Sequence, residues 1–169
     1  MNKIIIKTNN LNPHFIGSWI LEPLSICEDL INYFERNIAK QTKGRTIGGV
    51  NINIKDSVDI RINPKEIILP GNEAFKIYFE KLFECYKNYI NEWPFLKDLF
   101  QELEIGSFNI QKYSPGQHFK KIHTERSSID SSHRVFAFMT YLNDVDKGGS
   151  TYFSHYDLEI QPRKGLTLI

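Results

Sequence analysis

The part of the chain from Ser107 onward is a run of short apolar segments separated by turn-forming residues. β-Branched and aromatic residues favour extended backbone, whereas Gly, Pro, Asn and Asp favour turns, so this pattern is typical of strands. Strands this short are stable only when they bury a face against other strands or helices. We predict six strands here, at residues 108–113, 119–125, 135–142, 151–153, 158–160 and 166–169.

The first half of the chain carries two helical patterns, in which apolar residues recur every three to four positions. The first helix is predicted to begin at Ser25, because Ser25 and Glu28 have the spacing of a capping box; its apolar positions are Cys27, Leu30, Ile31, Phe34 and Ile38. The second is predicted over residues 73–93, ending before Pro94; its apolar stripe is Phe75, Phe79, Leu82, Phe83, Tyr86, Ile90 and Trp93. Strands at residues 3–7 and 58–62 and a turn at residues 9–13 complete the prediction.

Helices followed by strands favour one α+β domain over residues 1–169, with the N-terminal helices buttressing one sheet of a strand sandwich. A jelly-roll sandwich protects the edges of its strands with two facing sheets and can hold a metal ion between them. Cys27 and Cys85 fall within the helical patterns, so we predict buried free thiols, with a disulfide as the alternative.

Charge and hydropathy exclude some classes of partner. The chain has 21 basic and 20 acidic residues and a net charge of +1, which gives no electrostatic reason to expect nucleic acid or an anionic membrane. No signal peptide opens the chain, and no apolar run approaches the ~18 residues of a membrane span. We therefore expect a cytoplasmic protein whose partner is a protein, a peptide or a small molecule; the pattern leaves the oligomeric state open.

A candidate metal site lies in the predicted strand 119–125, where His123 and Glu125 are two residues apart. Side chains alternate along a strand, so the imidazole and the carboxylate are expected on one face. They could supply two of the three ligands of a 2-His-1-carboxylate iron site. His118 has the opposite parity and is expected to face away. For Glu125 the alternative is a solvated surface carboxylate, and His155 is a weak candidate for a third ligand.

The residues around this pair occur in a characteristic order: Tyr113, Gly116-Gln117, His123-Thr124-Glu125, Arg134, Tyr141-Leu142-Asn143 and Gly148-Gly149-Ser150-Thr151. From Tyr113 onward the chain resembles the iron(II)- and 2-oxoglutarate-dependent dioxygenases, and within them the prolyl 4-hydroxylase-like branch. Two features depart from the family pattern. Glu125 stands where the family usually has Asp, and one extra residue lies between Gly116 and His123.

The resemblance implies a double-stranded β-helix (a jelly-roll, cupin-like fold) that binds iron(II) through His123 and Glu125, with 2-oxoglutarate as co-substrate and ascorbate as a further cofactor. It implies that Tyr141 donates a hydrogen bond to the far carboxylate of 2-oxoglutarate, that Tyr113 lines the same pocket, and that Arg134 lies near the substrate mouth. Each has an alternative: Tyr141 and Tyr113 as structural tyrosines and Arg134 as a solvated residue at the end of a strand.

The family's second metal-binding His, and the Arg or Lys that pairs with 2-oxoglutarate, follow the segment that corresponds to residues 161–169. We therefore expect the C-terminal strands that carry them to lie beyond Ile169. The expected function is hydroxylation of prolyl residues in a protein or peptide, with a free amino acid or other small molecule as the next substrate class. The alternatives are a binding module of the same fold without catalysis and a cupin-like metal protein with other chemistry. Residues 46–53 and 55–59 could form a substrate flap or an irregular surface loop.

Overall fold

Strands from the two ends of the chain belong to the same antiparallel sheet of four strands. In the computed structural model, which describes residues 2–7, 14–99 and 103–169, its order is β1 (Asn2–Ile4), β2 (Ser18–Ile20), β11 (Leu166–Leu168) and β8 (Met139–Thr140). β11 is buried along its whole length because it has a neighbour on both edges, with Thr167 opposite both Trp19 and Thr140. The backbone groups of β11 are thereby satisfied on both edges.

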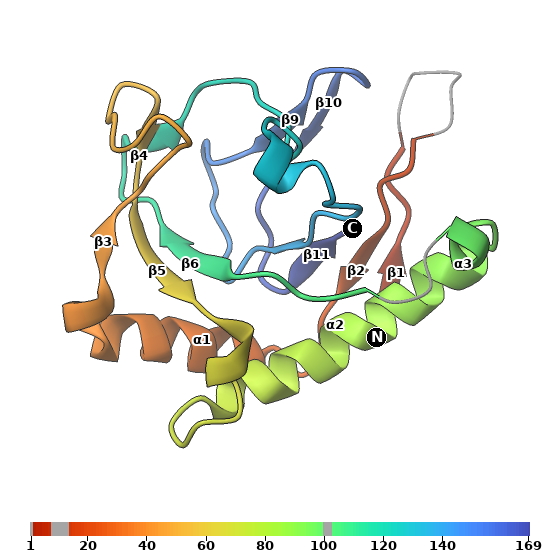
Figure 1. The fold of residues 1–169 in the computed structure, drawn as a ribbon, viewed down its shortest axis with the longest axis horizontal. Helices are drawn as coiled ribbons and strands as arrows, with labels where there is room; N and C mark the ends of the chain where they lie inside the picture. Colours follow the sequence, from red (N-terminus) through yellow and green to blue (C-terminus); the bar gives the residue numbers. More distant parts are fainter. Residues whose placement is uncertain (1, 8–13, 100–102) are drawn as a thin grey trace.

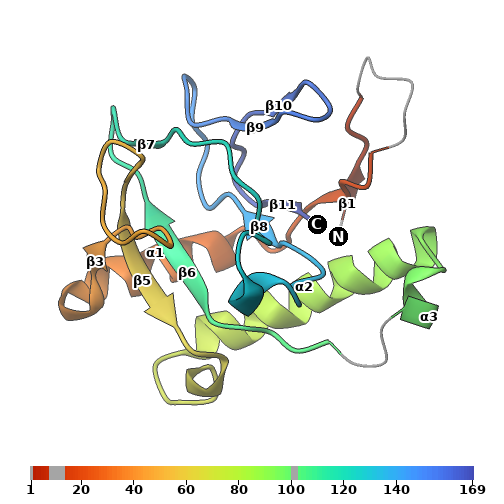
Figure 2. The ribbon, with the colours of Figure 1, turned by 45° about the horizontal axis from the view of Figure 1, so that its top comes forward.

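A second sheet and two ribbons complete the strand layer (Figures 1 and 2). The sheet has three antiparallel strands in the order β3 (Thr42–Lys43), β5 (Val58–Ile62) and β6 (Phe108–Lys112). One ribbon pairs β4 (Lys55–Asp56) with β7 (His118–Phe119), and the other pairs β9 (Thr151–Phe153) with β10 (Leu158–Ile160). The result is a mixed structure of helices and small antiparallel sheets.

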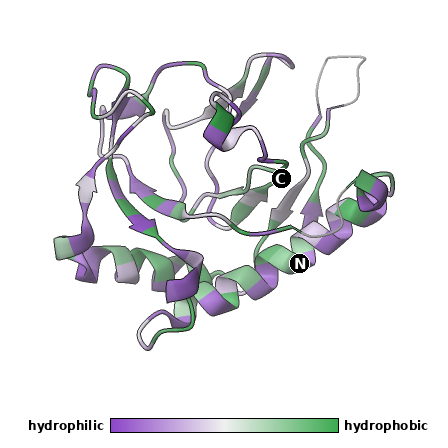
Figure 3. Ribbon diagram, viewed as in Figure 1, coloured by the Kyte–Doolittle hydropathy of each residue, from purple (hydrophilic) through white to green (hydrophobic). Residues whose placement is uncertain are grey.

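Two helices support these strands along one side of the molecule. α1 (Ser25–Arg36) packs against α2 (Glu73–Glu92), and a short α3 (Leu96–Leu99) follows. Figure 3 shows polar and apolar residues alternating along both long helices, as expected when one face is buried and the other is solvated. Single 3-10 turns lie at Ile38–Lys40, Pro64–Glu66 and Ile129–Ser131.

Three clusters of buried residues form the core. One joins α1, β5 and α2 and contains Ile26, Leu30, Tyr33, Phe34, Ile60, Ile62 and Phe75. The second lies where α2 meets the end of the chain and contains Trp19, Leu21, Cys85, Tyr89, Ile90, Leu96 and Ile169. The third joins β10 to β11 and contains Leu158, Ile160, Leu166 and Leu168. Cys27 and Cys85 are buried and form no disulfide, which confirms the prediction.

Both predicted helices are present, with errors in their details. The capping box at Ser25 is wrong, because Leu24 is the N-cap residue and no side chain caps the helix. Ile38 lies beyond α1 and is exposed, since the Asn37 side chain bonds the Tyr33 carbonyl and the helix ends at Arg36. Phe83 is not part of the buried stripe of α2: it is exposed and stacks on Tyr86.

Some strand predictions are confirmed and others are wrong. Strands 58–62, 151–153 and 158–160 have the predicted bounds, strands 108–113 and 166–169 are one residue shorter, and strand 3–7 is shifted to Asn2–Ile4. The predicted strands 119–125 and 135–142 shrink to the two-residue β7 and β8. The short strands β2, β3 and β4 were not predicted, and the predicted turn at residues 9–13 lies outside the described residues.

Residues 120–138 are irregular for a local reason. Hydrogen bonds between Ser128 and Ser131 cap a 3-10 turn over Ile129–Ser131, and the chain reverses there instead of continuing a ladder. The segment 55–59 is neither the flap nor the irregular surface loop that the sequence allowed, because Lys55, Ser57 and Asp59 are buried and the segment forms β4 and the start of β5. Residues 46–53 form an exposed turn, with an isolated bridge between Thr46 and Gly49.

In the parts of the chain that the structure describes, no helix is long and apolar enough to cross a membrane.

A buried ion pair ties the β4–β7 ribbon to the three-stranded sheet. Lys55 Nζ of β4 lies 2.7 Å from Asp59 Oδ2 of β5, and their side chains are 3% and 9% exposed. The Ser57 hydroxyl donates to the other carboxylate oxygen of Asp59 at 2.8 Å. Gly44 packs so closely here that a Cβ atom would lie 2.1 Å from the Ser57 hydroxyl oxygen. The pair therefore sits in a tightly packed, dehydrated environment.

Removal of one partner of this pair should destabilise the fold strongly. We expect Asp59→Ala to lower the free energy of unfolding by about 3–5 kcal/mol, because the Lys55 charge stays buried without its counter-ion. Glu35→Ala is the matched control, since it breaks the half-exposed Lys112–Glu35 pair and should cost at most about 1 kcal/mol. Urea denaturation of the two variants measures the difference, and equal small losses would contradict the analysis.

Candidate metal and co-substrate site

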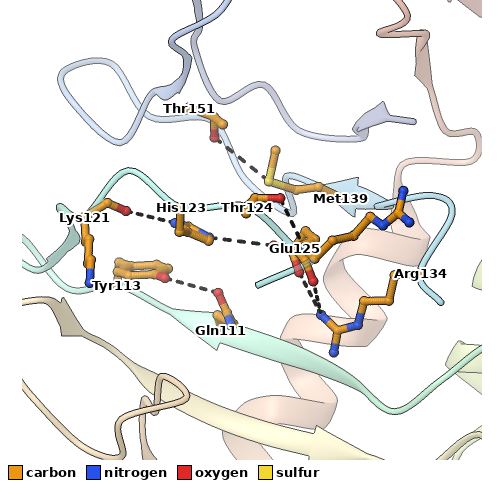
Figure 4. A network of polar contacts seen from close by, with 10 residues as sticks. Gln111, Tyr113, Lys121, His123, Thr124, Glu125, Arg134, Met139 and Thr151 are labelled. Carbon is orange, nitrogen blue, oxygen red and sulfur yellow. Dashed lines mark hydrogen bonds and ion pairs between the residues drawn. The ribbon is translucent and has the colours of Figure 1, made fainter. Parts of the chain in front are cut away.

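His123 and Glu125 lie side by side, although the strand that was predicted to align them is absent. Both residues belong to the irregular segment after β7. His123 Nε2 is nevertheless 3.7 Å from Glu125 Oε1 (Figure 4). Next to the pair, the Thr124 side-chain hydroxyl accepts a hydrogen bond from the backbone N–H of Arg126 at 3.2 Å. The two side chains are close together as predicted, but they lie in an irregular segment and not on a regular strand.

Two contacts fix the His123 ring. Its Nδ1 is 2.9 Å from the carbonyl oxygen of Lys121, and a carbonyl only accepts, so Nδ1 carries a proton; in the neutral form of the ring the lone pair is then on Nε2. The ring stacks on Phe119, with centroids 4.1 Å apart and planes inclined by 16°. Lys55 Nζ lies 5.6 Å from the centroid of the same phenylalanine ring. The buried ion pair is thus connected to His123 through Phe119.

Glu125 is held from the opposite side by Arg134. Arg134 NH1 lies 2.9 Å from Glu125 Oε2 and 3.5 Å from the Glu125 carbonyl oxygen (Figure 4). The side chains of His123, Glu125 and Arg134 are 42%, 53% and 51% exposed, so the group is open to solvent on one side. Arg134 was expected near the substrate mouth, and the structure places its guanidinium group against the candidate metal ligand.

The donor atoms of His123 and Glu125 fit two adjacent positions of a metal ion. Adjacent ligands of an octahedral ion with bonds of about 2.1 Å lie about 3 Å apart, and the observed separation is 3.7 Å. The two atoms would have to approach by about 0.7 Å to bind one ion in this way. Within the described residues no group of three His, Cys, Asp or Glu side chains could hold a metal ion. Among these residues the pair therefore has no third candidate ligand beside it, and metal binding stays a prediction.

Neither His118, which was expected to face away, nor the weak candidate His155 joins the pair. His118 lies on β7 opposite Asp56. Its Nδ1 is 3.4 Å from the Gly116 carbonyl oxygen, and its Nε2 is buried with no hydrogen-bond partner among the described residues. His155 is exposed in the turn between β9 and β10.

Tyr141 follows β8 and packs on the third core cluster. Its backbone N–H donates to the Leu166 carbonyl at 2.9 Å, and its hydroxyl donates to Thr151 Oγ1 at 2.6 Å. Burial raises the pKa of the Tyr141 hydroxyl above its usual value, so the phenol stays protonated and able to donate. Thr151 lies 3.9 Å from the Met139 sulfur (Figure 4). The role of Tyr141 toward a co-substrate stays a prediction.

Tyr113 lies at the end of β6 and is 40% exposed. Its hydroxyl donates to the Gln111 side-chain oxygen at 3.1 Å (Figure 4). Desolvation raises the pKa of Tyr113 to about 12, so its hydroxyl is neutral at physiological pH. As with Tyr141, its role in a co-substrate pocket stays a prediction.

No sequence pattern singles out Phe119, on which His123 stacks, or Lys55, which lies over the Phe119 ring. Phe119 was assigned only to a predicted strand, and Lys55 to a candidate flap. A lysine four residues before an aspartate is also common on solvated surfaces, so the Lys55–Asp59 pair becomes visible only when its burial is known.

The stack on His123 can be tested without a metal ion. Because the Phe119 ring lies flat against the imidazole, its ring current should shift the His123 ring protons upfield. In Phe119→Leu the apolar bulk remains but the aromatic face is lost, so these resonances should move back toward their unstructured positions. Proton NMR measures the change, with the exposed His155 as the internal control. Unchanged His123 resonances would contradict the stacked geometry.

The comparisons with known proteins give a local similarity. The chain is 35% identical over 78 residues to probable prolyl 4-hydroxylase 9 of Arabidopsis thaliana, with 35% of this chain and 27% of that protein covered. The chain thus spans about a quarter of the length of this curated relative. No protein-family model and no solved structure matches the chain. The similarity supports a distant relationship to the 2-oxoglutarate-dependent oxygenases.

Proposed function

We propose that this chain belongs to an iron(II)- and 2-oxoglutarate-dependent hydroxylase that acts on prolyl residues of a protein or peptide. The observation that carries the proposal is the 3.7 Å approach of His123 Nε2 to Glu125 Oε1. The local similarity to a probable prolyl 4-hydroxylase supports it independently. Under the same proposal, the small antiparallel sheets belong to a double-stranded β-helix.

The proposed role of each residue follows from its chemistry. His123 offers a neutral nitrogen lone pair, and Glu125 offers an anionic oxygen that offsets part of the charge of a divalent cation. Tyr141 offers a phenol proton to the far carboxylate of 2-oxoglutarate, which must be hydrogen-bonded if it is buried. When bound, iron(II) would allow dioxygen to act as the oxidant: one oxygen atom would go to 2-oxoglutarate, which is converted to succinate and CO2, and the other would be inserted into an unactivated C–H bond of the substrate as a hydroxyl group. Ascorbate would serve as an accessory reductant.

One observation favours a second candidate, a binding module of the same fold without catalysis. Glu125 already has a cationic partner at 2.9 Å in Arg134, and such a pair satisfies the carboxylate without a metal ion. The enzyme needs the His123 lone pair to bind a metal ion, whereas a binding module without a metal does not. A measurement of metal affinity therefore distinguishes the two functions. If the protein is an enzyme, a free amino acid or another small molecule is the alternative substrate class.

The first test concerns metal binding by the full-length protein. We expect one equivalent of iron(II), or of manganese(II) as a stable substitute, with affinity reduced more than about tenfold in His123→Ala and in Glu125→Ala, because loss of a ligand costs at least as much as loss of an outer contact. His155→Ala, which removes an exposed histidine elsewhere, is the matched control. Calorimetric titration under anaerobic conditions measures all four proteins. Wild-type affinity in both ligand variants would exclude this pair as the metal site.

The second test concerns Tyr141. If its hydroxyl turns from Thr151 to 2-oxoglutarate, Tyr141→Phe removes one hydrogen bond to a charged group, worth about 1.5–3 kcal/mol. The apparent KM for 2-oxoglutarate should then rise roughly ten- to a hundredfold, with metal affinity unchanged. Tyr78→Phe is the matched control, because the Tyr78 hydroxyl also bonds a threonine hydroxyl, that of Thr140 at 3.0 Å. Equal KM values in the wild type and Tyr141→Phe would make Tyr141 a structural residue.

A further inference from the structure

The two oxygens of the Glu125 carboxylate have different neighbours. Oε1 faces His123 Nε2 at 3.7 Å, and Oε2 accepts a hydrogen bond from Arg134 NH1 at 2.9 Å. The same guanidinium nitrogen lies 3.5 Å from the carbonyl oxygen of Glu125. Arg134 therefore contacts both the side chain and the main chain of Glu125.

This contact restricts what Glu125 can offer to a cation. A free glutamate can present one or both oxygens to a metal ion, or rotate away from it, because several single bonds separate its carboxylate from the backbone. A guanidinium hydrogen bond to Oε2 occupies one lone pair of that oxygen and draws its charge toward Arg134, so Oε1 is the better placed oxygen for coordination. It also limits the rotation of the side chain before any cation binds, which reduces the ordering that binding must impose.

We propose that Arg134 is a positioning residue that holds Glu125 as a single-oxygen ligand beside His123; this inference rests on the proposed function. Arg134 touches neither the cation nor the substrate in this role. It acts through Glu125, as a neighbour of the ligand commonly does in metal sites, where loss of such a contact lowers metal affinity about 10- to 100-fold.

Electrostatics alone gives the opposite expectation. A guanidinium close to a divalent cation repels it, so removal of its charge should tighten binding. Arg126 provides a control for this effect. It lies on the same segment, and its Nε donates to the Ser132 carbonyl at 3.0 Å. Arg126→Gln and Arg134→Gln each remove one positive charge near the site, and only the second removes a contact with Glu125 that the structure shows.

The experiment compares manganese(II) binding by full-length wild type, Arg126→Gln, Arg134→Gln and Arg134→Lys, titrated calorimetrically in low salt and in 1 M salt, where the Debye length is about 3 Å. We expect Arg134→Gln to bind about tenfold more weakly than Arg126→Gln in both conditions. Arg134→Lys keeps the charge and should recover part of the affinity. Difference infrared spectra of the metal-loaded proteins should show the Glu125 carboxylate changing from one-oxygen to two-oxygen coordination in Arg134→Gln.

The outcomes distinguish a failure of the positioning role of Arg134 from a failure of the proposed function. If the wild type and Arg126→Gln bind manganese(II) and Arg134→Gln binds it equally well, the positioning role is overturned and the proposed function stands. If the wild type binds no divalent cation, the proposed function fails, and the Glu125–Arg134 contact is a surface ion pair. Thermal unfolding curves show whether each variant is folded. If Arg134→Gln does not fold, the manganese(II) affinity of Arg134→Lys decides whether Arg134 positions Glu125.

Discussion

The buried ion pair between Lys55 and Asp59 connects the fold to the candidate site. It joins β4 to β5, and β4 pairs with β7, the strand after which the candidate ligands follow. Lys55 also lies over the Phe119 ring, on which His123 stacks. A buried pair of this kind tolerates little displacement, because a charge that loses its partner in a dehydrated environment is strongly unfavourable. The position of the His123 ring is therefore coupled to the packing of the three-stranded sheet.

The site itself combines an ordered interior with an open face. Phe119 and the Lys121 carbonyl fix His123, and Arg134 fixes Glu125, yet the side chains of both candidate ligands remain about half exposed. Such an arrangement leaves the donor atoms accessible while their supporting contacts hold them near one geometry. Tyr141 differs, because its hydroxyl is satisfied by Thr151 and must exchange that bond to reach a co-substrate.

The spacing of apolar residues correctly predicted those elements whose pattern lies within one short stretch of sequence. The apolar stripe of α2 and the alternation in β5 depend on local spacing, and both elements are found where expected. The pairing of β2 with β11 joins residues that are far apart in the chain, so no local pattern indicates it. The strand predicted over residues 119–125 is reduced to β7, and in the segment that follows the side-chain hydroxyls of Thr124 and Ser131 bond backbone N–H groups that a strand would pair with a neighbour. The proximity of His123 and Glu125 was predicted from that strand and is found in an irregular segment.

The central claim is that His123 and Glu125 hold a metal ion, and anomalous X-ray diffraction tests it most directly. Crystals of the full-length protein with manganese(II) should be measured on both sides of the manganese absorption edge. If the two residues hold the ion, one strong anomalous peak should lie about 2 Å from both His123 Nε2 and Glu125 Oε1. A peak at other residues, or none near this pair while the protein binds manganese(II) in solution, would contradict it.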